Sequence, residues 1–228
     1  MDKQTAISRV QELQAHYKAN DDVLGQLSHV NLIAVVGPTG AGKSTVVRQS
    51  GMPFVIGDTT RAPREGEVQG RDYNFRSDFN NVIDEIERGE FVQFVVQRGT
   101  EIYGTKASSF PGSGACAMSI LASELPKFRK LGFGSVMPVY IVPPNHTEWM
   151  HRISAHRDKD LEARLMEAKE SLKAALADPS YVFILNDDLN AAVECLRAVV
   201  RGSVNQTDSA RARSAANTLY EHLQRVIR

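Results

Sequence analysis

The sequence predicts an α/β fold in which a parallel β-sheet carries helices on both faces. Two observations predict it. Short apolar runs alternate along the chain with amphipathic stretches, which is the pattern of parallel strands joined by helical crossovers. The first apolar run, residues 31–37, has the continuous apolar character of a strand buried on both faces, and it leads into a glycine-rich loop and a helical pattern. A chain of 228 residues is long enough for one sizeable domain of this kind.

The remaining elements follow from their periodicity. Four apolar residues between positions 79 and 86 recur at the spacing of one helix face, for example. The expected strands are residues 31–37, 91–96, 115–120, 136–142 and 181–185. The expected helices are residues 5–29, interrupted by an Asn-Asp-Asp break at 20–22, the stretch after Gly42, and residues 79–88, 146–157, 160–176, 188–200 and 206–228.

These elements divide the chain into an N-terminal helical extension at residues 1–30, a main domain at 31–205 and a C-terminal helix at 206–228. The sequence leaves two roles open for the terminal helices. They either pack on the core of the same chain or hold a homodimer together.

Composition excludes several classes of partner. Lys and Arg together number 27, as do Asp and Glu, so the formal net charge is zero. Without an excess of positive charge, neither nucleic acid nor an anionic membrane is expected as a partner. Cys116 and Cys195 match no metal-binding spacing and are expected to be reduced and buried. The chain has no apolar signal segment at its start and no run of the roughly 20 apolar residues that span a membrane, so we expect a cytoplasmic protein.

Residues 37–44, GPTGAGKS, match the phosphate-binding pattern G-x-x-x-x-G-K-[ST] between an expected strand and an expected helix. The glycines allow backbone N–H groups to surround phosphate oxygens at a helix N-terminus, where the helix dipole also favours an anion. Lys43 would reach the β- and γ-phosphates, and the Ser44 hydroxyl would bind Mg²⁺. The predicted donor-binding residues are Gly37, Pro38, Thr39, Gly40, Ala41, Gly42, Lys43, Ser44 and Thr45.

A second motif, TTRAPREGEVQGRDYNF, occupies residues 59–75. The segments GEFVQFVVQRGTEIYGT at 89–105 and ILNDDLNAA at 184–192 follow it. Together they resemble the guanylate kinase family, and the likeness covers about residues 32–202. The resemblance implies a P-loop NTPase-type fold with a small acceptor-binding part at about 58–113 and a lid at about 145–165. It also implies ATP and Mg²⁺ as cofactors.

The resemblance assigns roles to individual residues. The residues that would hold the phosphate of the acceptor are Arg61, Arg64, Tyr73 and Tyr103. Guanidinium forks and phenolic hydroxyls suit a compact dianion of this kind. Gln93 and Thr105 would contact the base, and Asn186 would lie near the adenine of ATP. Together with Lys43, the catalytic residues would be Arg157 and Arg164 of the lid, which stabilise the charge of the transferring phosphoryl group.

The chain departs from the family pattern at the base and at the metal. Guanylate kinases typically have a glutamate where this chain has Gln93, and an amide oxygen cannot accept both of the guanine protons that a carboxylate accepts. Residues 107–123 contain none of the family's acidic residues near the metal, and Asp58 is a candidate to replace them through water. Gly57 stands where the family usually has serine.

The leading hypothesis is therefore an ATP-dependent kinase of a nucleoside monophosphate, most simply GMP or dGMP, whose partners are small-molecule nucleotides. Two alternatives stay open. One is a kinase of another phosphorylated acceptor, either a different nucleoside monophosphate or ribose 1,5-bisphosphate. The other is a catalytically weak binding module, although the intact Gly42, Lys43 and Ser44 favour turnover.

Overall fold

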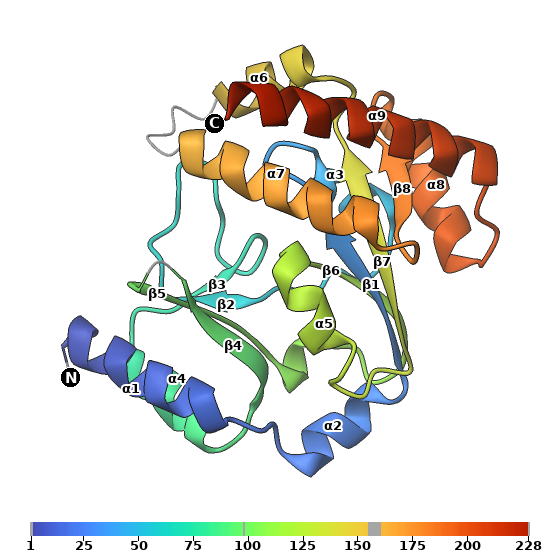
Figure 1. Ribbon diagram of the computed structural model, residues 1–228. Helices are drawn as coiled ribbons and strands as arrows, with labels where there is room; N and C mark the ends of the chain where they lie inside the picture. The colour runs from blue at the N-terminus through green and yellow to red at the C-terminus, as the bar shows by residue number, and fades with distance from the viewer. Residues whose placement is uncertain (1, 98, 155–160, 228) are drawn as a thin grey trace. The chain divides into compact units, whose positions relative to one another are not determined.

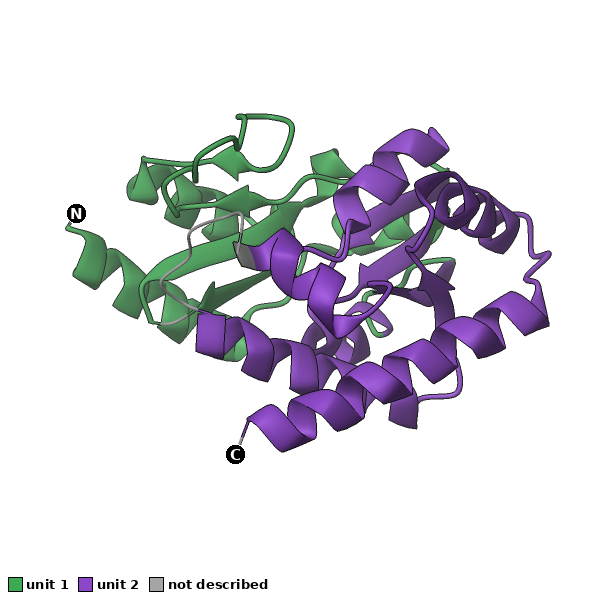
Figure 2. Cartoon of the chain, turned by 90° about the horizontal axis from the view of Figure 1, so that it is seen from above, with its two compact units in different colours: residues 1–31, 55–114, 130–134 green, residues 32–54, 115–129, 135–228 purple. Residues whose placement is uncertain are grey.

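The computed structural model describes residues 2–97, 99–154 and 161–227. Two compact units share the chain (Figure 2). Unit 1 contains residues 1–31, 55–114 and 130–134, and unit 2 contains residues 32–54, 115–129 and 135–228.

Unit 2 is built on the parallel sheet that the sequence predicts, with the strand order β6-β1-β7-β8 (Figure 1). Its strands are β1 (Val30–Val36), β6 (Gly114–Ser119), β7 (Ser135–Val142) and β8 (Val182–Leu185). Its helices are α3 (Lys43–Ser50), α5 (Leu125–Phe128), α6 (His146–Ser154), α7 (Leu161–Ala177), α8 (Leu189–Val200) and α9 (Gln206–Val226), with a short 3₁₀ turn, η2, at Ala122–Glu124.

Helices cover both faces of this sheet. On one face, Val35 and Ile141 lie in a buried core with Val47 of α3 and Leu196 of α8. On the other face, the hydroxyl of Tyr140 lies 2.8 Å from the Ser171 hydroxyl of α7. Successive residues of a strand point to opposite faces, which is why neighbouring positions of β7 contact different helices.

Unit 1 contains a second sheet with the order β3-β2-β5-β4. Its strands are β2 (Asp58–Thr59), β3 (Asn74–Phe75), β4 (Phe91–Gln97) and β5 (Glu101–Lys106). Its helices are α1 (Lys3–His16), α2 (Asp21–Leu27), α4 (Phe79–Glu87) and the 3₁₀ turn η1 (Ala107–Ser109). The β4–β5 and β5–β2 pairs are antiparallel, whereas β2 and β3 are parallel.

The core of unit 1 joins α1 to α4 and to one face of this sheet. Ile7 and Val10 of α1 are buried with Ile86 of α4 and with Phe94 and Ile102 of the sheet. The apolar stripe expected between positions 79 and 86 is confirmed, since α4 buries three of its members against this core. The apolar face of the N-terminal helix is thus covered within the chain.

One expectation needs correction here. The apolar run at 91–96 forms a strand, but β4 lies in the mixed sheet of unit 1 rather than in the parallel sheet. It pairs with β5, which the sequence did not predict, and Gly99 ahead of β5 has a φ of +66°. The helical extension expected at 5–29 is two helices, and α2 begins at the expected Asn-Asp-Asp break, where the side chain of Asn20 caps its N-terminus.

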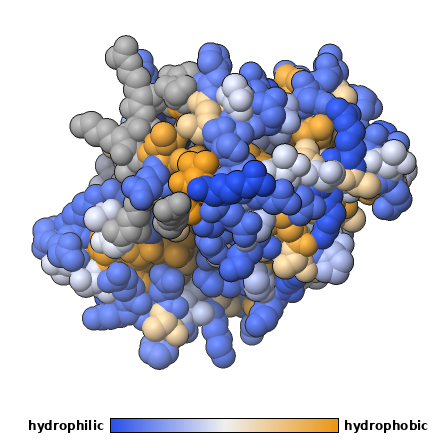
Figure 3. Space-filling model, turned by 45° about the horizontal axis from the view of Figure 1, so that its top comes forward, coloured by the Kyte–Doolittle hydropathy of each residue, from blue (hydrophilic) through white to orange (hydrophobic). Residues whose placement is uncertain are grey.

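The face seen in Figure 3 is mostly hydrophilic, with apolar side chains in smaller areas between polar ones. Over the described ranges, no helix has both the length and the apolar character needed to cross a membrane.

Candidate active site

The phosphate loop of unit 2 connects β1 to α3, as the motif requires. Two of its glycines lie where a side chain would meet close neighbours and where the backbone conformation favours glycine. A Cβ atom on Gly37 would lie 2.5 Å from the carbonyl oxygen of Ile141, and one on Gly42 would lie 2.3 Å from Nδ2 of Asn186. Both residues also have positive φ angles, +145° and +90°, which favour glycine. The loop backbone is therefore free of side chains where it must approach a phosphate closely.

Lys43 is the first residue of α3, and its ammonium lies inside the loop. Its Nζ donates to the carbonyl oxygens of Gly37, at 2.6 Å, and of Pro38, at 3.0 Å. Although part of the residue reaches the surface, desolvation of the ammonium lowers the pKa of Lys43 from 10.5 to about 8, and the charge of Glu167 opposes this only partly. An ammonium desolvated in this way gains much from a phosphate anion, which would replace the carbonyl oxygens as its partner.

Two distant side chains hold the loop in place. The indole Nε1 of buried Trp149 donates to the carbonyl oxygen of Thr39 at 2.8 Å. Nδ2 of Asn186 donates to the carbonyl oxygen of Ala41, also at 2.8 Å. Sequence reasoning missed Trp149, and the only signal available was that it is the single tryptophan of the chain. Asn186 was expected near an adenine, and the structure places it beside Gly42 of the loop.

Ser44 and Thr45 follow Lys43 in the first turn of α3. Ser44 is partly buried and Thr45 is exposed. The Ser44 hydroxyl is a suitable ligand for a hard cation such as Mg²⁺. Within the residues that the structure describes, no group of three or more His, Cys, Asp or Glu side chains could hold a metal ion. Mg²⁺ at phosphate-transfer sites is commonly bound through one or two protein oxygens together with substrate phosphates, a role that the Ser44 hydroxyl could fill.

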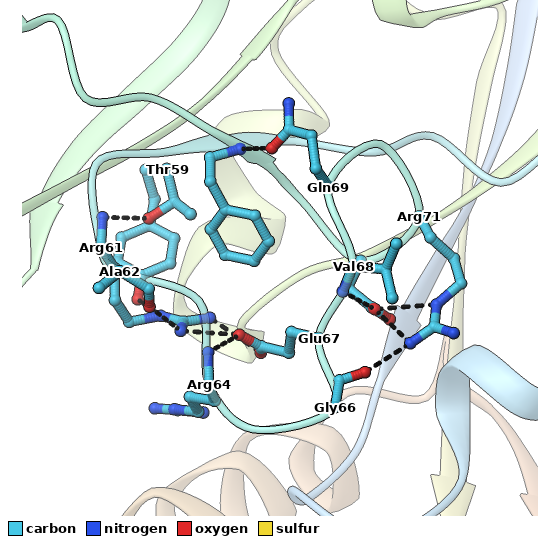
Figure 4. A network of polar contacts seen from close by, with 12 residues as sticks. Thr59, Arg61, Ala62, Arg64, Gly66, Glu67, Val68, Gln69 and Arg71 are labelled. Carbon is cyan, nitrogen blue, oxygen red and sulfur yellow. Dashed lines mark hydrogen bonds and ion pairs between the residues drawn. The ribbon is translucent and has the colours of Figure 1, made fainter.

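The acceptor motif lies in unit 1, where the guanidinium of Arg61 makes several polar contacts (Figure 4). Its Nη1 and Nη2 atoms bind the carboxylate of Glu67 at 2.8 and 2.9 Å, and its Nε donates to the hydroxyl of Tyr103 at 3.1 Å. The guanidinium also lies over the rings of Tyr73 and Phe75, about 5.5 Å from each centroid. The structure therefore brings three of the four predicted phosphate ligands together.

Glu67 is the organising residue of this loop, and sequence reasoning did not single it out. Besides the fork of Arg61, its carboxylate accepts the backbone N–H of Arg64 at 2.7 Å. Burial favours the neutral acid, but the hydrogen bonds from Arg61 and Arg64 outweigh it and keep the pKa of Glu67 below its ordinary value. The side chain of Arg64 is exposed, and Arg71 is an exposed residue paired with Asp72.

Gln93 and Thr105, the predicted base contacts, lie opposite each other on β4 and β5. Nε2 of Gln93 is 3.4 Å from the hydroxyl oxygen of buried Thr105. Gly57 lies beside them, and a Cβ there would come within 2.9 Å of the Gly104 carbonyl oxygen. Glycine at position 57 therefore leaves room for the backbone of β5.

Asp58 is not the replacement for the missing metal ligands that the sequence suggested. It is buried, Nδ2 of Asn74 donates to one of its oxygens at 2.9 Å, and Arg76 forms an ion pair with the other. Arg76 also pairs with Glu85 at 2.9 Å, and Lys106 pairs with Glu85 at 2.7 Å. The carboxylate of Asp58 is thus committed to a buried ion network in unit 1.

The two predicted lid arginines are Arg157 and Arg164. Arg157 lies outside the described residues. Arg164 is a buried residue of α7 with only 7% of its surface exposed.

Comparison with known proteins agrees with this geometry. The family model described as guanylate kinase matches residues 29–203. The chain is 33% identical over 206 residues to a guanylate kinase of Dechloromonas aromatica (strain RCB), which covers 85% of this chain and 98% of that relative. It is 34% identical over 180 residues to a guanylate kinase of Nocardia farcinica (strain IFM 10152), which covers 72% of this chain and 90% of the relative.

A solved structure supports the fold. The guanylate kinase from Anaplasma phagocytophilum matches with a TM-score of 0.57 at 23% identity, over 79% of this chain and 90% of that one. Because the family match covers most of the sequence and includes both the phosphate loop and the arginine motif, the chain belongs to the guanylate kinase family.

Proposed function

We propose that this chain transfers the γ-phosphoryl group of ATP to a nucleoside monophosphate, GMP or dGMP, and releases ADP with GDP or dGDP. The observation that carries the proposal is the phosphate loop with its desolvated Lys43, in a chain that belongs to the guanylate kinase family. An intact donor loop of this kind favours a catalytic kinase over a module that only binds nucleotides.

On the donor side, the loop backbone from Gly37 to Gly42 binds phosphate oxygens, and Lys43 neutralises charge on the β- and γ-phosphates. Members of this family use ATP with Mg²⁺. Bound through Ser44, the metal would neutralise charge on the phosphates during transfer. Asn186 and Trp149 position the loop, since each donates a hydrogen bond to a loop carbonyl.

On the acceptor side, Arg61, Arg64, Tyr73 and Tyr103 hold the monophosphate dianion. Arg61 and Tyr103 are already hydrogen-bonded, so the site is preorganised before the acceptor arrives. In this proposal residues 58–113 form the acceptor-binding part and residues 145–165 the lid. Arg157 and Arg164 stabilise negative charge on the transferring group, as a phosphoryl transfer without a covalent intermediate requires.

A homodimer through the terminal helices would have to use their exposed faces, which are mostly polar. Ala6, Ile7 and Val10 of α1 are buried in the core of unit 1, and α9 buries Ala212, Ala216, Leu219 and Leu223 within unit 2. Sedimentation equilibrium of the purified chain tests this assignment. If the dimer persists after charge-reversing substitutions on the exposed faces of α1 and α9, its interface must lie elsewhere.

A coupled assay of ADP release tests the proposed function, with GMP, dGMP, AMP, CMP, UMP, IMP and ribose 1,5-bisphosphate as acceptors. We expect turnover with GMP and dGMP, and its loss in Lys43→Met. Lys173→Ala is the matched control, because Lys173 is an exposed lysine of α7. Turnover only with ribose 1,5-bisphosphate, or tight nucleotide binding without turnover, would refute the proposal.

A further inference from the structure

One face of the unit 1 sheet is polar and faces away from the apolar core of that unit. Gln93 lies opposite Thr105 in the β4–β5 register, and Val95 lies opposite Tyr103. Because successive residues alternate between faces, Gln93, Thr105 and Tyr103 share one face. Phe94 and Ile102, which belong to the other face, are buried in the core with α1 and α4.

Gln93 carries an unused acceptor on this polar face. Its Oε1 has essentially no exposed surface, and it has no hydrogen-bond partner among the described residues. Its Nε2 lies 3.4 Å from the Thr105 hydroxyl. A buried amide oxygen without a donor is unfavourable, so this atom indicates a ligand that brings an N–H group to it.

The anion-binding end of the motif adjoins this amide. Tyr103, whose hydroxyl accepts from Nε of Arg61, lies two residues before Thr105 on β5. That separation is about 7 Å along the strand. An acceptor whose phosphate binds Arg61 and Tyr103 therefore extends its base toward Gln93 and Thr105, an argument that rests on the function proposed above.

We propose that Gln93 makes this chain a kinase of 6-oxopurine nucleotides that reads the N1–H and O6 edge of the base and leaves the 2-amino group unread. An amide offers one acceptor and two N–H donors. Oε1 accepts from N1–H of the purine, while Nε2 uses one proton for Thr105 and the other for O6. Guanine and hypoxanthine share this edge, so GMP and IMP are both substrates.

Adenine fits the amide less well in the orientation that the structure shows. Adenine presents a donor at position 6 and an acceptor at position 1, which is the reverse of the 6-oxopurine edge. The amide would have to turn over from the orientation in which Oε1 is the unpartnered atom to match it. A carboxylate at position 93 would behave differently again, because it accepts both N1–H and the 2-amino group and so selects guanine.

The experiment measures kcat/KM and equilibrium dissociation constants for GMP, IMP and AMP in the wild type, Gln93→Glu and the control Gln14→Glu. Gln14 accepts a hydrogen bond from the backbone N–H of Val96, so its replacement adds the same charge beside β4 and keeps that acceptor. For the wild type we expect GMP and IMP values within about tenfold of each other and weaker binding of AMP. Gln93→Glu should raise the GMP to IMP ratio by about tenfold or more, and Gln14→Glu should leave it unchanged.

Several outcomes overturn the inference. They are a wild type that already rejects IMP by more than about a hundredfold, a ratio that is equal in Gln93→Glu and in the wild type, or no binding of either 6-oxopurine nucleotide. If the wild type binds GMP and IMP equally but turns over neither, the proposed kinase function fails while the assignment of Gln93 stands.

Discussion

The guanidinium of Arg61 and the carboxylate of Glu67 form a two-point ion pair, with N–O distances of 2.8 and 2.9 Å. The side chains are 14% and 20% exposed, so water screens the pair only in part. The carboxylate orders Arg61 and the backbone of Arg64 together. The carboxylate of Glu67 therefore helps to fix the conformation of the acceptor loop.

Replacing Glu67 with alanine should raise the KM for GMP about tenfold and leave the KM for ATP unchanged. The reason is that Arg61 and the Arg64 backbone lose their shared acceptor, and one charge-assisted hydrogen bond corresponds to about that factor. Steady-state kinetics with each substrate varied in turn provide the measurement. A lower KM for GMP would show instead that Glu67 competes with the acceptor's phosphate for Arg61.

Affinity for ATP should fall as the pH rises above about 8, the pKa of Lys43 before the donor binds. A bound polyphosphate favours the ammonium and raises this pKa, so below pH 8 the lysine is charged in both states and the affinity is constant. Above that pH the free protein must take up a proton on binding, which costs up to about tenfold in affinity per pH unit. Calorimetric titration between pH 7 and pH 10 measures the slope. Lys43→Met should show no such step, and an identical slope in both proteins would contradict the assignment.

The pKa of Lys43 also has a consequence for stability. Because the folded pKa is depressed, the unfolded chain binds more protons between about pH 8 and pH 10.5. The contribution of Lys43 to the free energy of unfolding therefore increases with pH over that window.

Gly42→Ala should abolish ATP binding and lower the free energy of unfolding by about 1–3 kcal/mol. The new methyl group would meet Nδ2 of Asn186 at 2.3 Å, at a residue with a φ of +90°. Gly25→Ala is the control, because Gly25 lies in α2 and a Cβ there has no atom within 4 Å. Alanine favours a helix interior, so this variant should be as stable as the wild type or slightly more so. Chemical denaturation and a nucleotide-binding assay measure both effects, and equal losses in both variants would contradict the steric argument.

Arg76→Met should destabilise unit 1 by about 3 kcal/mol. The substitution keeps an apolar stem but removes the cation from the carboxylate of Asp58, which is only 5% exposed, and leaves Glu85, 9% exposed, with Lys106 alone. Arg71→Met removes an arginine that is 53% exposed and should change the free energy of unfolding by less than about 1 kcal/mol. Urea denaturation compares the two variants. A loss in Arg76→Met no larger than in Arg71→Met would show that the network contributes little.

The sequence by itself determined the donor loop, the arginine motif and the order of most helices and strands. These features depend on local chemistry: glycines where a backbone must approach phosphate, and apolar spacing that matches one face of a helix. Residues 37–44 could be recognised because strand, loop and helix follow one another without interruption.

Only the tertiary structure decided the rest, because the deciding contacts join residues far apart in sequence. An apolar run such as 91–96 fits a parallel or an antiparallel sheet equally well, and its pairing with β5 settled the choice. The sequence does not show that Asp58 has a partner, and only the folded structure brings Arg76 into an ion pair with it. Trp149 and Asn186 support the phosphate loop across 110 and 145 residues of chain, a role that no local pattern encodes.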